Sequence, residues 1–202
     1  HIEYDAPLTA DIEGIAHPVS DWVRTSTDSA RVASDAACAI AASRASPGAV
    51  ATLVLPADTA WGSSNGAAKT VSPSTATAPD SSAVDECARA LRSGEPAMLL
   101  LGGRALRSVP LETAGRIAVG TGAELRSELM AARTERGSGR VSIERIPYPV
   151  DQAVGVLENV RHLILVGTVS PVAFLPIRTS PACWRRPAAK YILWPVLQMI
   201  CW

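Results

Sequence analysis

Three short apolar runs, each ending at glycine or proline, constrain the fold of this chain more than any other feature. They span residues 50–55 before Pro56, residues 97–101 before Gly102-Gly103, and residues 162–166 before Gly167. A short run that is polar on neither face is typical of a strand covered on both sides, as in parallel sheets. Helical patterns lie between the runs, so the sequence predicts an α/β fold with parallel strands.

Capping residues and three- and four-residue apolar spacing mark the predicted helices. These span residues 11–16, about 26–41, 83–91, 111–119 and 151–157. Pro18 stops the first helix and Pro47-Gly48 ends the second. Asp151 is the predicted N-cap of the last helix, and the charged stretch 131–145 is predicted to be a loop.

Composition divides the chain into two folded pieces, a linker and a tail. Residues 62–82 are dominated by Gly, Ser, Thr, Ala and Pro, which indicates an exposed linker. Segments 1–61 and 83–174 each combine helices with apolar strands, so we expect two partial, doubly wound, Rossmann-like parallel-sheet pieces.

Residues 175–202 differ from the rest of the chain. They contain four basic residues, no acidic residue, and four prolines that exclude a long helix or a central strand. We interpret them as an atypical, irregular C-terminal tail. Out-of-frame translation is favoured over a tryptophan-rich segment that binds a membrane or a partner.

Charge and cysteine spacing exclude several classes of function. Nineteen basic and nineteen acidic residues leave the chain neutral, whereas a general nucleic-acid binder needs a basic surplus. The sequence shows no secretory signal and no apolar stretch of about 20 residues that could span a bilayer. We therefore expect a cytoplasmic protein without a membrane span. The four cysteines have no C-x-x-C spacing, so we expect small buried thiols, not a disulfide framework or zinc site: Cys38, Cys87, Cys183 and Cys201.

Gly102-Gly103-Arg104 is the strongest candidate binding segment. A glycine pair after a buried strand lets a phosphate approach the backbone, and a helix N-terminus after it favours an anion. The G-x-G-x-x-G spacing of dinucleotide sites is not met, and a glycine pair at a strand end more often forms a tight turn than a nucleotide site. Residues 62–66 match G-x-S-x-G but open the linker, and no histidine has a partner at metal-ligand spacing. These residues alone form no complete catalytic constellation and no metal site.

Several blocks, taken in order, resemble one enzyme family. They are residues 4–12, 18–24 with the pattern P-V-S-x-W, 47–58, 87–106, 147–148 and 160–167. The first three resemble the end of the pyrimidine-binding domain of thiamine diphosphate-dependent enzymes, in particular the acetolactate synthase large-subunit group. The other three resemble the central domain of the same group.

The resemblance implies a function for the intact family. Its members decarboxylate a 2-oxo acid such as pyruvate and join the product to a second 2-oxo acid, in branched-chain amino acid biosynthesis. They use thiamine diphosphate and Mg²⁺ and form homo-oligomers. Some members hold FAD or ADP in the central domain, where Gly102, Gly103 and Arg104 would form the first loop.

The resemblance also indicates which parts are absent from this sequence. In the family, a glutamate early in the pyrimidine domain protonates the cofactor, and a G-D-G…N motif holds its diphosphate and Mg²⁺. Residues 1–202 contain neither that early region nor that motif. We therefore predict a fragment, with 1–61 from the pyrimidine-binding domain and 83–174 from the central domain, that is inactive alone and binds neither thiamine diphosphate nor Mg²⁺. A non-catalytic nucleotide-binding module and an inert α/β remnant are the alternatives.

Overall fold

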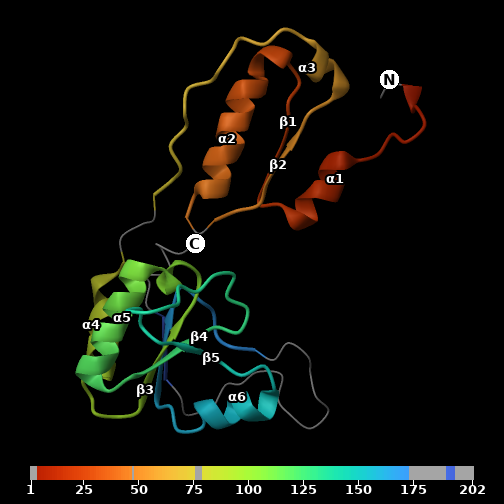
Figure 1. Cartoon of the computed structure of the whole chain (residues 1–202). Helices are drawn as coiled ribbons and strands as arrows, with labels where there is room; N and C mark the ends of the chain where they lie inside the picture. Colours follow the sequence, from red (N-terminus) through yellow and green to blue (C-terminus); the bar gives the residue numbers. More distant parts are fainter. Residues whose placement is uncertain (1–3, 47, 76–78, 173–189, 194–202) are drawn as a thin grey trace. The chain divides into compact units, whose positions relative to one another are not determined.

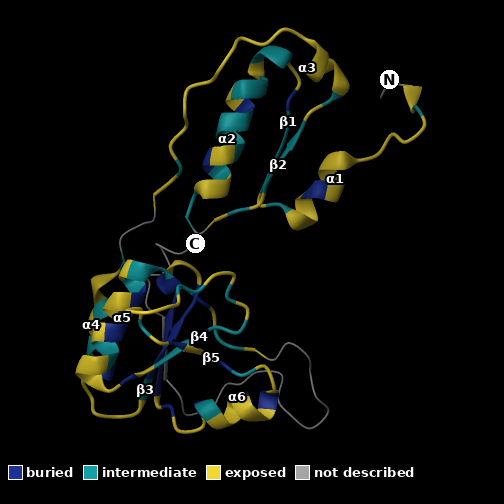
Figure 2. Ribbon diagram, in the orientation of Figure 1, coloured by how far each residue is buried: buried dark blue, intermediate teal, exposed yellow. Residues whose placement is uncertain are grey.

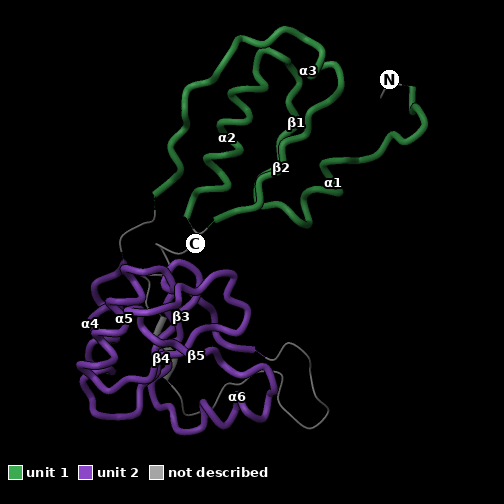
Figure 3. The backbone as a smooth tube through the Cα atoms, viewed as in Figure 1, with its two compact units in different colours: residues 1–76 green, residues 77–202 purple. Residues whose placement is uncertain are grey.

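The computed structural model of the chain describes residues 4–46, 48–75, 79–172 and 190–193, the last by their backbone. It divides into two compact units, unit 1 (residues 1–76) and unit 2 (residues 77–202), which Figure 3 colours separately. The division falls inside the predicted linker, whose described residues from 63 to 75 form no helix or strand. Both units contain parallel strands and helices, which confirms the predicted α/β class.

Unit 1 is built on two parallel strands (Figure 1). Strand β1 (Trp22–Thr25) pairs with β2 (Ala51–Val54), with Trp22 opposite Ala51. The connection between them contains the 3₁₀ turn η3 (Ser29–Arg31) and helix α2 (Val32–Arg44). The remaining short elements are α1 (Ile12–Ala16), η2 (His17–Val19) and α3 (Ala57–Trp61).

Two of the predicted helix starts in unit 1 are confirmed by their caps. The carboxylate of Asp11 accepts a hydrogen bond from the N–H of Gly14 at 2.8 Å, and that of Asp28 accepts one from Ala30 at 2.9 Å. Each cap satisfies a backbone donor that the first turn leaves without a partner.

Strand β2 forms where it was predicted, but the expectation that it is fully buried is wrong. All four of its residues are half-buried. Figure 1 shows α2 along one side of the two strands and the short α1 on the other. Helix α1 buries only Ala16, while Ile12 and Ile15 are exposed, so it covers little of the sheet. A strand is buried on both faces only where helices cover both.

Unit 2 is a five-stranded parallel sheet in the order β5-β4-β3-β6-β7. Its strands are β3 (Ala97–Leu101), β4 (Glu124–Ser127), β5 (Glu144–Arg145), β6 (His162–Val166) and β7 (Lys190–Leu193). Strands β4 and β5 therefore lie in order on one side of β3, and β6 lies on its other side.

The two central strands of unit 2, β3 and β6, are buried on both faces, as predicted. On one face, their side chains pack with helices α4 (Ser81–Leu91) and α5 (Ser108–Thr121): Leu99, Leu101, Ile164 and Val166. On the other face, alternate side chains pack with α6 (Val150–Leu157): Met98, Leu100, Leu163 and Leu165. Figure 2 shows the buried residues concentrated in this sheet.

The structure corrects several details of unit 2. The predicted loop 131–145 ends in strand β5, which pairs with β4. Asp151 is not the N-cap of α6, because the helix starts at Val150 with Pro149 before it, and Asp151 lies in the first turn. A negative charge in that turn still favours the helix through its dipole. Strand β4 was not predicted. Strand β7 lies within the predicted irregular tail and adds an edge strand, the position that flanking prolines allow. Residues 173–189 and 194–202 lie outside the described residues, so the out-of-frame interpretation stays a prediction.

No helix within the described residues is both apolar enough and long enough to cross a bilayer.

Replacing Leu99 with alanine should destabilise unit 2, since the side chain is 1% exposed in the core beneath α4 and α5. We expect a loss of about 2–5 kcal/mol, measured from hydrogen exchange of the β3 and β6 amides. Val119→Ala is the control, because Val119 is 90% exposed on α5, and it should change stability by less than about 0.5 kcal/mol. Equal effects of the two substitutions would contradict the described core.

Candidate functional site

The carboxyl ends of β4, β3 and β6 meet around one acidic side chain. Glu128 follows β4, Gly102 and Gly103 follow β3, and Gly167 and Thr168 follow β6. The strand order reverses its direction of growth at β3 and β6, and open α/β sheets bind ligands at such a reversal, outside the carboxyl ends of the strands. We call these five residues the switch-point site.

Glu128 connects the ends of both neighbouring strands. Its Oε1 accepts a hydrogen bond from the backbone N–H of Gly103 at 3.2 Å, and its Oε2 accepts one from the hydroxyl of Thr168 at 2.7 Å. Its own N–H donates to the carbonyl of Leu101 at 2.9 Å, which fixes the start of the side chain. Within the described part of the chain, no basic nitrogen forms a salt bridge with this carboxylate.

Gly102 leaves the space that the Glu128 carboxylate occupies. A Cβ atom at Gly102 would lie 2.6 Å from the carbonyl oxygen of Gly167 and 2.7 Å from the carboxyl carbon of Glu128. The backbone N–H of Gly102 donates to the carbonyl of Val166 at 2.9 Å, so this part of the chain is held against β6. Gly103 has a φ of +49°, a left-handed conformation that glycine adopts easily.

A cavity of about 200 Å³ opens beside the Glu128 carboxylate. Most of its wall is apolar and comes from the segments after β4 and β6 together with two core side chains: Leu100, Leu129, Met130, Ile146, Val169 and Val172. Its polar side chains are those of Glu128, Thr168 and Ser170. The hydroxyl of Ser170 is buried and has no hydrogen-bond partner among the described residues.

The structure brings two of the three predicted site residues to the switch point and leaves the third outside. Gly102 and Gly103 lie in the site, whereas Arg104 is exposed in the short 3₁₀ helix η4 (Gly103–Leu106). A cofactor-binding role for these three residues stays a prediction. Sequence reasoning missed Glu128 because β4 was not predicted, so no strand end pointed to residue 128. It also missed Thr168, although the strand before it was predicted.

The described residues do not fit a flavin or ADP at this site. The backbone N–H of Gly103, the donor a phosphate would use, already donates to a carboxylate. A cavity of about 200 Å³ is below the usual range of about 300–1,000 Å³ for ligand pockets. The described residues also contain no group of three His, Cys, Asp or Glu side chains that could hold a metal ion.

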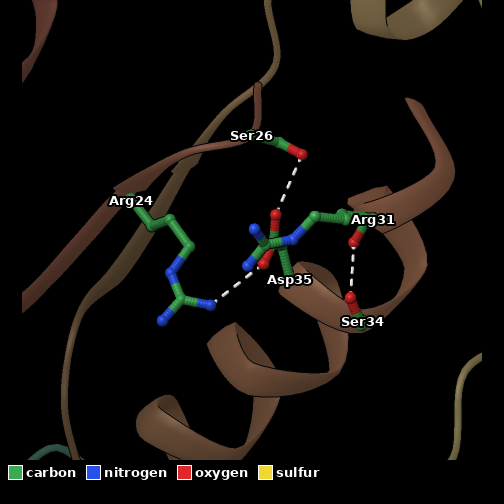
Figure 4. A network of polar contacts seen from close by, with 5 residues as sticks. All are labelled: Arg24, Ser26, Arg31, Ser34 and Asp35. Atoms are coloured by element: carbon green, nitrogen blue, oxygen red, sulfur yellow. Dashed lines mark hydrogen bonds and ion pairs between the residues drawn. The ribbon is translucent and has the colours of Figure 1, made fainter. Parts of the chain in front are cut away.

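A second polar cluster lies in unit 1 and has a structural role (Figure 4). Asp35 of α2 is 3% exposed, and its two carboxylate oxygens accept hydrogen bonds from Arg24 at 2.9 Å and from Ser26 at 3.0 Å. The guanidinium of Arg24 also lies 5.1 Å from the ring centre of Trp22. Burial raises the pKa of the Asp35 carboxyl, but the hydrogen bonds and the charges of Arg24 and Arg31 outweigh it. The pKa of Asp35 is therefore below its ordinary value of 3.8. The cluster fastens α2 to β1.

Replacing Arg24 with methionine should leave the buried Asp35 carboxylate without the cation that donates a hydrogen bond to it. We expect faster hydrogen exchange of the backbone amides of α2 and β1, because the buried carboxylate loses a charged hydrogen-bond donor. Arg44→Met is the control, because it removes the same charge at the exposed end of α2. Unchanged exchange in Arg24→Met would show that the contact does not stabilise unit 1.

The same pair predicts a pH dependence. Because the pKa of Asp35 is lower in the folded chain, its charge stabilises unit 1 above pH 3.8 and this contribution disappears as pH falls through the folded-state pKa. In Arg24→Met the folded-state pKa rises, so protection of α2 should fall at a higher pH than in the wild-type chain.

Cys87 of α4 confirms the expected buried thiol. It is 0% exposed, and burial, aided by the charge of Glu86, raises the pKa of its thiol to about 11. The thiolate is the reactive form of cysteine, so Cys87 is not suited to act as a nucleophile. Cys38 is half-buried and free, while Cys183 and Cys201 lie outside the described residues.

Iodoacetamide should therefore modify Cys38 before Cys87 in the folded chain at pH 8. Peptide mass spectrometry at several reaction times measures the two rates, and urea should bring them together. Faster modification of Cys87 in the absence of urea would show that α4 does not bury it.

Sequence comparison identifies relatives of this chain. Over 182 residues it is 44% identical to a protein of Mycobacterium tuberculosis (strain ATCC 25618 / H37Rv) that is provisionally named acetolactate synthase large subunit IlvX. This chain is a relative of acetolactate synthase large subunit-like proteins. The match covers 90% of the chain and 35% of the relative, so the chain spans about a third of the relative's length. No protein-family model matches the chain.

Solved structures show the same fold. A protein of Mycobacterium smegmatis, provisionally described as a thiamine diphosphate-dependent enzyme, superposes with a TM-score of 0.75 at 18% identity, over 95% of this chain and 37% of that one. The thiamine diphosphate-dependent 4-hydroxybenzoylformate decarboxylase of Rhodococcus jostii RHA1 gives 0.67 at 17% identity, over 99% and 42%. Benzoylformate decarboxylase of Polynucleobacter necessarius gives 0.60 at 17% identity, over 98% and 42%. These likenesses and the 44% identity together confirm the resemblance inferred from the sequence.

Proposed function

We propose that this chain supplies α/β scaffold to an acetolactate synthase-like, thiamine diphosphate-dependent protein and is not a catalyst by itself. The observation that carries this proposal is the 44% identity over 182 residues with an acetolactate synthase large subunit-like protein. In this proposal, unit 1 corresponds to part of the pyrimidine-binding domain and unit 2 to part of the central domain.

The family reaction is decarboxylation of one 2-oxo acid followed by carboligation to a second. Bound thiamine diphosphate supplies the carbanion chemistry, and the surrounding protein supplies binding, orientation and electrostatics. By the same resemblance, we assign the intact protein to the magnesium-dependent, homo-oligomeric, cytoplasmic enzymes of branched-chain amino acid biosynthesis.

The residues of this chain support a scaffold role over a catalytic one. The printed sequence has no G-D-G…N motif, and the described residues offer no cluster of metal ligands. The buried acidic side chain of unit 1, Asp35, is engaged by Arg24 and Ser26 and holds α2 to β1. Asp35 therefore serves the packing of unit 1.

Purified residues 1–202 should form no acetolactate from pyruvate when thiamine diphosphate and Mg²⁺ are added. The product is measured by colorimetric assay and mass spectrometry, with an active acetolactate synthase as the positive control. Calorimetric titration with thiamine diphosphate and Mg²⁺ should likewise give no binding heat. Turnover above the protein-free blank would overturn the proposal.

A nucleotide-binding module is the alternative function. The position of Gly102 and Gly103 at the switch point favours it, whereas the engaged N–H of Gly103 and the small cavity oppose it. Titration with ADP and FAD distinguishes it from the scaffold role. Binding of either ligand by the wild-type chain would favour this candidate.

A further inference from the structure

At the switch point of unit 2, a carboxylate of the chain itself accepts hydrogen bonds from the ends of two strands. Glu128 accepts the backbone N–H of Gly103 with one oxygen and the hydroxyl of Thr168 with the other. Thr168 is 5% exposed, so its hydroxyl has little access to water and depends on this acceptor. The two donors nearest the reversal of strand order are therefore both engaged.

The backbone around Glu128 is shaped to hold this carboxylate. Gly102 has no side chain at the point where a Cβ would lie 2.7 Å from the Glu128 carboxyl carbon and Oε1. The N–H of Glu128 is fixed on the carbonyl of Leu101 at 2.9 Å. The close packing at Gly102 and the two hydrogen bonds agree in placing the carboxylate between the ends of β3 and β6.

We propose that Glu128 is a specificity-determining residue that closes the switch point of unit 2 to phosphate-bearing ligands. A phosphate that approaches Gly103 meets a negative charge that no basic side chain within the described residues neutralises by a salt bridge. The backbone N–H of Gly103, which would donate to the phosphate, already donates to Glu128. The phosphate therefore binds only if it displaces Glu128 from two hydrogen bonds. This role goes beyond the proposed scaffold function and does not depend on it.

Glu128 would exclude a phosphate in two ways: by its negative charge and by the space that its side chain fills. Glu128→Gln removes the charge but keeps the length of the side chain and an acceptor for the N–H of Gly103. Glu128→Ala removes both the charge and the atoms, and it enlarges the adjoining cavity of about 200 Å³. The proposal therefore orders the affinity for a phosphate ligand as Glu128→Ala, then Glu128→Gln, then wild type.

The test is calorimetric titration of the full 202-residue chain with inorganic pyrophosphate and, separately, with ADP. Glu158→Gln is the matched control, because it removes the same charge from an exposed side chain after α6. The wild-type chain and the control should give no saturable binding heat. Glu128→Ala should instead give saturable pyrophosphate binding, with a Kd at least about tenfold below the highest concentration at which wild type gives none.

Three outcomes decide the proposal. A gain in both Glu128 variants but not in Glu158→Gln supports it. Wild-type binding as tight as that of Glu128→Ala overturns it, and so does the absence of binding in both variants when hydrogen exchange of β3 and β6 matches wild type. If Glu128→Ala does not fold, Glu128→Gln decides alone, since it preserves the shape of the site. Acetolactate formation is a separate measurement, so failure here is distinguishable from failure of the scaffold proposal.

Discussion

Burial of β3 and β6 on both faces is the constraint on which unit 2 depends. The two strands pair in register, with Leu99 beside Ile164 and Leu100 beside Leu165, and alternate side chains enter the two cores on opposite faces of the sheet. Such strands bury a polar side chain only where it has a partner, as His162 at the start of β6 has in Glu95 at 2.6 Å. Polar groups therefore gather where the strands end, and this explains why Glu128 and Thr168 lie together at the carboxyl edge.

Unit 1 is held together by a different kind of interaction. Its two strands are half-buried, and its largest helix is fastened through a buried carboxylate that accepts bonds from Arg24 and Ser26. Apolar burial is weakly directional, whereas the bonds to Asp35 fix one arrangement of α2 on β1. The two units thus reach an α/β arrangement by a two-sided apolar core in one case and by a polar anchor in the other.

Sequence patterns predicted those helices and strands whose formation depends on their own residues. The apolar runs located β3 and β6, and the capping side chains of Asp11 and Asp28 located two helix starts. Strand β4 was missed because its sequence, Glu-Leu-Arg-Ser, has little apolar character, and it is a strand through its pairing with β3. Tertiary pairing of this kind is not encoded in a local pattern.

The sequence predicted where the candidate site lies but not which side chains form it. The glycine pair after β3 indicated a close approach to the backbone, and the structure shows such an approach at Gly102. Glu128, which makes the approach, lies 25 residues beyond Gly103, and only the pairing of β3 with β4 brings it there. The contact between Arg24 and Asp35 was hidden in the same way, since it requires α2 to pack on β1.

The close approach at Gly102 has an evolutionary consequence. A methyl group there would collide with a backbone carbonyl on one side and with the carboxyl group of Glu128 on the other. The residues at positions 102 and 128 therefore cannot be substituted independently of each other. Among descendants of a common ancestor, a larger residue at the first position is tolerated only together with a shorter one at the second and a shifted β6 terminus, so the two columns of an alignment should covary.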